Sequence, residues 1–63
     1  MDMEGKTAVV SGAASGLGKA VAERLVEQGA NVALFDLNEA AGRDVVIDLD
    51  ERAGESRAQF FKV

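Results

Sequence analysis

The chain contains no cysteine, no histidine and no proline. Without cysteine it has no disulfide to fasten a small core, and without cysteine or histidine it lacks the usual ligands of a structural zinc site. Its length of 63 residues allows one domain or less. A domain this small buries only about 60% of its unfolded surface, so its stability must come from an idealised core or from association with another chain. A hydrophobic content of 48% argues against disorder.

Basic residues are also scarce, with 7 Lys and Arg against 11 Asp and Glu and a net charge of −4. This balance disfavours nucleic acid and anionic membrane surfaces as partners. The first six residues, Met-Asp-Met-Glu-Gly-Lys, lack the apolar segment of a signal peptide. No apolar run approaches the ~18 residues of a membrane-spanning helix. We therefore expect a cytoplasmic protein that does not contact membranes.

Apolar runs alternate with amphipathic stretches along the whole chain. The runs predict strands over residues 6–10, 31–36 and 57–63. Because these runs are continuous rather than alternating, they predict burial of both strand faces, as in a parallel sheet covered on both sides. The expected fold is therefore α/β, one β-α-β-α-β half of a Rossmann-like doubly wound parallel sheet with strand order 3-2-1. Residues 1–63 are therefore expected to form a single half-domain of such a sheet.

Two helices are predicted between these strands, over about residues 15–28 and, after the N-cap Asn38, to about residue 53. Gly29 and Gly54 are the expected left-handed stops. Placed at 100° intervals, the first helix has a stripe of small and apolar residues: Leu17, Gly18, Val21, Ala22, Leu25 and Val26. The second has Ala41, Val45, Val46, Leu49 and Ala53 on its inner side, and Ile47 lies outside.

Three glycines follow the first strand and open the first helix. Gly12 permits a tight turn out of the strand, Gly16 permits close approach of phosphates to the backbone, and Gly18 lets the helix pack against the strand. Ser15 adds a hydroxyl toward a ligand, and Leu17 lies between the last two glycines. A strand, a glycine-rich turn and a helix in this order form a backbone cradle for a pyrophosphate. Ordinary turn glycines are the alternative, which the flanking strand and helix disfavour.

Asp36 closes the second strand, 18 residues after Gly18. In a βαβ unit that position lies beside the first loop, where a carboxylate accepts both hydroxyls of an adenosine ribose and repels a 2′-phosphate. The sequence therefore favours NAD over NADP, with Leu37 as a further cofactor-binding residue. A solvated aspartate that caps the next turn is the alternative.

Two other groups of residues invite functional interpretations that we consider weaker. Asp44, Asp48, Asp50 and Glu51 resemble a metal site, but a solvated helix face with nearby arginines explains them better, and no metal is expected. Phe60 and Phe61 are interpreted as core and edge-strand residues rather than as a platform for stacking a ligand.

The segment Ser-Gly-Ala-Ala-Ser-Gly-Leu-Gly at residues 11–18 resembles the N-terminal glycine motif of the short-chain dehydrogenase/reductase family. Ser11 stands where that family usually has threonine, so a hydroxyl is kept. The resemblance extends to the flanking residues 5–10, 22–25 and 29–30 and to Asp36. It implies a Rossmann-fold NAD(P)(H)-dependent oxidoreductase of alcohol and carbonyl groups, usually a dimer or tetramer. Members with aspartate at the end of the second strand tend to use NAD, and hydroxysteroid and 3-hydroxyacyl-CoA dehydrogenases are the most similar in character.

The family's catalytic Ser, Tyr and Lys lie well downstream and have no counterpart here, since the chain has no tyrosine at all. We therefore expect an NAD(H)-binding segment of an oxidoreductase that is inactive alone. A free-standing nucleotide-binding or self-assembling module is the alternative. Both crossovers of such a half-domain place their helices on one sheet face and leave the first strand as an open edge. This predicts a homo-oligomer formed through the first strand or through the bare sheet face.

Overall fold

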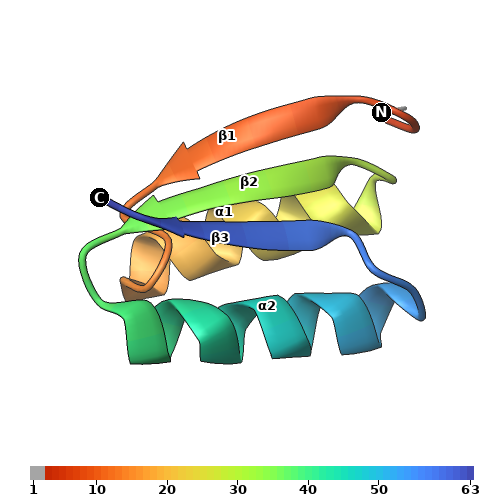
Figure 1. The fold of residues 1–63 in the computed structure, drawn as a ribbon. Helices are drawn as coiled ribbons and strands as arrows, with labels where there is room; N and C mark the ends of the chain where they lie inside the picture. The colour runs from red at the N-terminus through yellow and green to blue at the C-terminus, as the bar shows by residue number, and fades with distance from the viewer. Residues whose placement is uncertain (1–2) are drawn as a thin grey trace.

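The computed structural model describes residues 3–63, which form a three-stranded sheet and two helices (Figure 1). In chain order the elements are β1 (Thr7–Ser11), α1 (Gly16–Glu27), β2 (Asn31–Asp36), α2 (Glu39–Ala53) and β3 (Ala58–Lys62). The α/β alternation is thus confirmed, with β2 and α2 at their predicted bounds. The first strand begins and ends one residue later than expected, and β3 is shorter by one residue at each end. In these residues no helix is long and apolar enough to cross a membrane.

The three strands are parallel and follow the order β1-β2-β3, so that β2 lies in the centre. Leu34 of β2 pairs with Val10 on one side and with Phe60 on the other. The expected order 3-2-1 describes the same neighbours counted from the opposite edge, and it leaves β1 as an edge strand. The carboxyl ends of all three strands point to the same end of the sheet, where β1 turns into α1 and β2 turns into α2 (Figure 1).

Local side-chain and backbone chemistry sets the ends of both helices. Ser15 caps α1 by accepting a 3.1 Å hydrogen bond from the Gly18 N–H, and Asn38 caps α2 by accepting a 3.0 Å bond from the Ala41 N–H. Gly29 (φ 96°) and Gly54 (φ 75°) adopt the left-handed conformation expected of helix stops. The predictions for Asn38, Gly29 and Gly54 are confirmed, whereas the capping role of Ser15 was not predicted.

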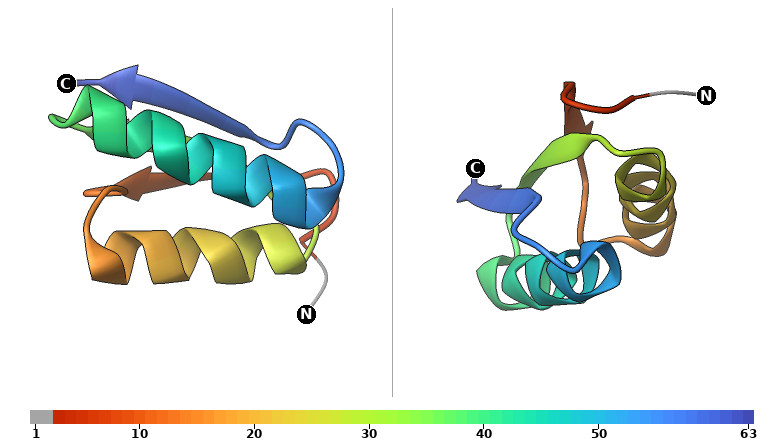
Figure 2. Two further views of the ribbon diagram at one scale, coloured as in Figure 1. Left: turned by 90° about the horizontal axis from the view of Figure 1, so that it is seen from below. Right: turned by 90° about the vertical axis from the view of Figure 1, so that its right-hand side faces the viewer.

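Both helices cover the same face of the sheet (Figure 2). The core lies between them and the strands, and two leucines, Leu34 of β2 and Leu49 of α2, have no exposed surface. The other residues of this core are Val10, Ala13, Ala22, Val26, Val32, Val45 and Ala58. Gly42 of α2 also belongs to the buried surface, because a Cβ there would lie 2.1 Å from Cε1 of Phe60. The phenylalanine ring therefore rests directly on the backbone of the helix.

The opposite face of the sheet is bare, which confirms the prediction that both crossovers place their helices on one face. The burial of both strand faces, inferred from the continuous apolar runs, is not found in this chain. Val9 is 71% exposed although its neighbour Val10 is 7% exposed. The reason is topological, since both crossovers place their helices on one side. Phe35 and Phe61 lie on this bare face and stack with ring centroids 5.1 Å apart. Phe61 is thus an exposed residue of the edge strand, whereas Phe60 packs against the core.

The stripe predicted for α1 is only partly buried. Gly18, Ala22 and Val26 face the sheet, but Leu17 is 79% and Val21 45% exposed. These two residues lie on the side of the helix toward the open edge of β1, where no further element follows within the described chain. The outward position predicted for Ile47 is confirmed by its 58% exposure.

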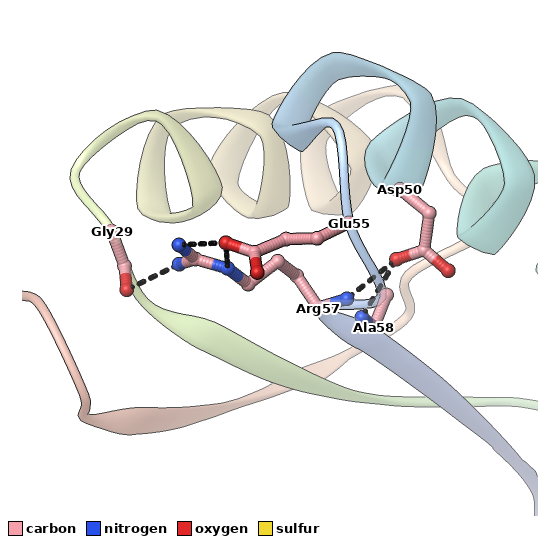
Figure 3. A network of polar contacts seen from close by, with 5 residues as sticks. All are labelled: Gly29, Asp50, Glu55, Arg57 and Ala58. Atoms are coloured by element: carbon pink, nitrogen blue, oxygen red, sulfur yellow. Dashed lines mark hydrogen bonds and ion pairs between the residues drawn. The ribbon is translucent and has the colours of Figure 1, made fainter.

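The amino end of β3 is held by a polar network that the sequence did not predict (Figure 3). Oδ1 of Asp50 accepts hydrogen bonds from the N–H groups of Arg57 (2.8 Å) and Ala58 (3.0 Å). The Arg57 guanidinium donates to the carbonyl of Gly29 at 2.6 Å and to the carboxylate of Glu55. One arginine therefore ties the end of α1 to the start of β3.

Candidate functional site

The glycine-rich loop lies at the carboxyl end of the sheet, between β1 and α1. Gly12 has φ 68°, a left-handed conformation that favours glycine, and it turns the chain out of the strand as predicted. Its N–H donates a 2.8 Å hydrogen bond to the carbonyl of Phe35, which fixes the loop against the end of β2.

Gly18 provides the close packing predicted for it. A Cβ at this position would lie 2.2 Å from the carbonyl oxygen of Gly12 and 3.1 Å from Cα of Ala13. The helix therefore touches the backbone of the loop immediately after β1, rather than the strand itself. Because both contacts are with backbone, no side-chain rotation can make room for a Cβ here.

The start of α1 presents free backbone donors to open space. A Cβ at Gly16 would meet nothing within 4 Å. Of the four N–H groups that a helix start leaves without helical acceptors, those of Ser15 and Gly18 are satisfied, by the Gly12 carbonyl and by Oγ of Ser15. The N–H groups of Gly16 and Leu17 remain available in the part of the chain that the structure describes. Two free N–H groups at a helix N-terminus, beside an unfilled position, suit an anionic group.

The hydroxyl of Ser15 is already engaged. It donates to the carbonyl of Gly12 at 2.7 Å while its oxygen caps the helix. Its predicted contact with a ligand therefore stays a prediction, and its role in the structure is to hold the turn between the loop and α1.

Asp36 lies where predicted, at the end of β2 beside the glycine-rich loop. Its Oδ2 accepts a hydrogen bond from the Ala14 N–H at 3.0 Å, and its Oδ1 accepts one from the Asn38 N–H at 2.9 Å. These bonds, that from Asn38 first and that from Ala14 second, hold the pKa of the Asp36 carboxyl below its ordinary value. The carboxylate is therefore ionised at neutral pH.

The bond from Asn38 matches the alternative expectation for Asp36, a carboxylate that caps the next turn. Asp36 was expected beside the first loop, but the bond from Ala14 itself was not predicted, because 22 residues separate the two along the chain. The bond brings the β1–α1 loop and the β2–α2 loop together at one end of the sheet. It gathers the predicted cofactor-binding residues there: Gly12, Ser15, Gly16, Leu17, Gly18, Asp36 and Leu37. Leu37 is 74% exposed in the second loop.

Asp48, one of the acidic residues of α2, is paired with basic side chains of both helices. Asp48 pairs with Arg52 of its own helix at 3.1 Å and with Lys19 of α1 at 3.7 Å. The hydrogen bond from Arg52 lowers the pKa of Asp48. Within residues 3–63 no three acidic side chains come together in a way that could hold a metal ion.

A groove of about 320 Å³ runs beside β1 on the side away from β2. It is lined by β1 residues 9–11, by Ser15 and by four residues of α1, namely Leu17, Gly18, Val21 and Leu25. The groove is adjacent to the free N–H groups at the start of α1. Its lining is mostly apolar.

Residues 6–63 match the family model described as short chain dehydrogenase. The chain belongs to the short-chain dehydrogenase family. The resemblance inferred from residues 11–18 is thereby confirmed. Among the curated relatives, the 3-beta-hydroxysteroid dehydrogenase of Comamonas testosteroni is 47% identical over 51 residues, which are 81% of this chain and 20% of that protein. The chain spans about a fifth of the length of the curated relatives that it matches.

Solved structures of short-chain dehydrogenases share this arrangement of strands and helices. L-Sorbose reductase from Gluconobacter frateurii, complexed with NADPH and L-sorbose, matches with a TM-score of 0.89 and 34% identity over 100% of this chain and 24% of its own. A short-chain dehydrogenase/reductase from Burkholderia phymatum in complex with NAD matches with a TM-score of 0.85 and 33% identity over 100% of this chain and 22% of its own. The structural neighbours thus include both an NADPH complex and an NAD complex.

Proposed function

We propose that the chain is the NAD(H)-binding N-terminal segment of a short-chain dehydrogenase and forms half of a doubly wound sheet. The observation that carries the proposal is the start of α1, where the N–H groups of Gly16 and Leu17 have no acceptor within residues 3–63 and a Cβ on Gly16 would meet nothing within 4 Å. A pyrophosphate there would receive hydrogen bonds from both groups and the favourable end of the helix dipole. Gly12 and Gly18 support this site by shaping the loop and bringing the helix against it.

NAD is the cofactor we propose, in preference to NADP. Asp36 stands at the end of β2 as an ionised carboxylate, where it would accept ribose hydroxyls and repel a 2′-phosphate. The solved relatives include an NAD and an NADPH complex. The preference therefore rests on Asp36 and not on the family. When bound, the cofactor would supply hydride transfer, and the residues of this chain would hold its adenosine end.

The oxidoreductase activity on alcohol or carbonyl groups would belong to the whole protein. The chain has no tyrosine, so it lacks the residue of this family that would hold a proton at the substrate oxygen. We propose a cytoplasmic location, with which the absence of cysteine is compatible.

Calorimetric titration with NAD tests the cradle. Gly16→Val fills the open position at the helix start and should reduce the heat of binding to background. Ala20→Val is the control, because it places the same valine side chain at an exposed position of the same helix, and it should bind like the unaltered chain. Equal binding by the Gly16→Val and unaltered proteins would remove the cradle from the proposal.

We also propose that a second copy of the chain covers the open edge of β1. By the period of two along a strand, the N–H and C=O groups of Thr7, Val9 and Ser11 point away from β2. Val9 is 71% exposed, and the apolar groove continues along this edge. An edge strand without a charge or proline from Thr7 to Ser11 is a template for pairing.

Sedimentation equilibrium at micromolar concentration should show a dimer. Val9→Lys, which places a charge on the edge, should give a monomer with unchanged helix content. A folded monomer of the unaltered chain would overturn this part of the proposal. A dimer that binds no NAD would favour the alternative of a self-assembling module without a cofactor.

A further inference from the structure

The carboxylate of Asp36 joins two loops that are far apart in the sequence. Ala14, which donates to Oδ2 at 3.0 Å, lies 22 residues before it, and Asn38, which donates to Oδ1 at 2.9 Å, follows it by two. Each carboxylate oxygen thus receives one backbone hydrogen bond. The glycine-rich loop and the start of α2 are both fixed to the same side chain.

Three successive N–H groups of the glycine-rich loop are directed at the end of β2. Those of Gly12 and Ala13 donate to the carbonyl of Phe35, at 2.8 Å and 3.4 Å. That of Ala14 donates to the Asp36 side chain. The first two bonds would survive any substitution in β2, because their acceptor is backbone. The third depends on the identity of residue 36, so this residue controls how the middle of the loop is held.

We propose that Asp36 is a positioning residue for the glycine-rich loop, and that it sets the phosphate-binding backbone before the cofactor arrives. This inference rests on the proposed NAD(H) site and adds a role for Asp36 beyond recognition of the ribose. A carboxylate has about four acceptor positions on its two oxygens, and the loops occupy two of them. Ribose hydroxyls can therefore be accepted while the loops stay attached. The phosphate and ribose ends of the site are coupled through one side chain.

The coupling leads to a result that ribose recognition alone does not give. If Asp36 only reads the ribose, Asp36→Ala weakens NAD binding and leaves NADP binding unchanged or improved, because a repulsive charge has gone. If Asp36 also positions the loop, the same substitution weakens both cofactors, by roughly tenfold for the loss of charge-assisted hydrogen bonds. Asp44→Asn is the control, since it removes one charge from the exposed face of α2 and should leave both affinities unchanged.

The positioning role is tested first without any cofactor. In the ¹⁵N-labelled chain, amide exchange at Ala14 should be faster in Asp36→Ala than in the unaltered protein, by about tenfold or more. Exchange at Gly12, whose acceptor is a backbone carbonyl, should change much less. An unchanged rate at Ala14 would overturn the inference and leave the proposed NAD site standing.

A pH titration of the unaltered chain tests the same contact even if the Asp36→Ala variant does not fold. As Asp36 is protonated, the amide resonances of Ala14 and Asn38 should shift together, with a midpoint below the ordinary aspartate value. If the Asn38 resonance titrates and that of Ala14 does not, the contact with the loop is refuted. A chain that shows the coupled titration but binds no NAD would refute the proposed function and keep the link between the loops. NADP binding that is undiminished in folded Asp36→Ala would refute the coupling to the phosphate end.

Discussion

Replacing Gly18 by alanine should destabilise the fold, although alanine is the better helix former. The new Cβ would lie 2.2 Å from the carbonyl oxygen of Gly12 and 2.8 Å from its carbonyl carbon. An ordinary carbon–oxygen contact is about 3.3 Å, so α1 and the loop would have to separate by roughly 1 Å. That movement would weaken the hydrogen bond from the Gly18 N–H to the capping hydroxyl of Ser15. It would also loosen the packing of the neighbouring Ala13, which has no exposed surface.

The expected net loss is a difference between two effects. Overpacking of a tight site costs about 1–3 kcal/mol. The gain in helix propensity from glycine to alanine is at most about 1 kcal/mol. We expect the free energy of unfolding to fall by about 1–2 kcal/mol, in a chain whose core supplies only about 3–5 kcal/mol. Urea unfolding followed by circular dichroism measures this directly.

Gly16→Ala is the matched control, because it makes the same change two residues earlier in the same helix. Nothing lies within 4 Å of its new Cβ. We expect an unchanged or slightly increased free energy of unfolding. If the two variants unfold at the same urea concentration, the close approach of α1 to the loop does not exclude a Cβ at residue 18, and the predicted destabilisation is refuted.

Three further predictions concern the rest of the fold. Asp50→Ala removes the acceptor of two backbone N–H groups at the start of β3 and should lower the free energy of unfolding in urea by about 1–3 kcal/mol. Asp50→Asn keeps an oxygen acceptor and should lower it less. Equal losses of stability in the two variants would contradict the role of that oxygen. Gly42→Ala would place its Cβ 2.1 Å from the Phe60 ring and should therefore destabilise the chain. Adding Phe60→Leu in a double variant should recover part of the lost stability. If the stability losses of the two single variants simply add in the double variant, the ring is not the obstacle. Hydrogen bonds or ion pairs lower the pKa of three carboxyl groups in the folded state, those of Asp36, Glu39 and Asp48. The stability that these groups contribute is complete above their unfolded pKa values of about 3.9–4.3, and it is lost as the pH falls through their folded pKa values. The thermal midpoint should therefore be level from about pH 7 to pH 5 and decline below about pH 4, and a midpoint that rises on acidification would contradict the sign.

Features that depend on short stretches of chain were predictable from the sequence. The cap Asn38 and the stops Gly29 and Gly54 each act within one helical turn, and all three lie where expected. The central strand β2 also has its predicted bounds, since its unbroken apolar run is closed by a charged residue.

Features that depend on which elements lie next to each other were not predictable in the same way. The apolar character of Val9, Leu17 and Val21 indicated burial. Val9 is exposed because both helices cover the other face of the sheet, and Leu17 and Val21 are exposed because no further element lies beside β1 within the described residues. Sequence periodicity reports which face is apolar and cannot report what covers it. The contact of Gly42 with Phe60 was missed for the related reason that 18 residues separate the two along the chain (60 − 42).

The central place of β2 has a consequence for how the chain folds. Neither outer strand touches the other, and each reaches β2 only across a helical crossover: Thr7 pairs with Asn31, and Val32 pairs with Ala58. No strand–strand hydrogen bond can therefore form until one crossover has closed, which makes the cost of that closure part of the folding barrier. The first βαβ unit is complete once residue 36 has left the ribosome, whereas β3 has no place to dock until β2 is present. Residues 31–36 thus serve as the common template on which the outer strands assemble.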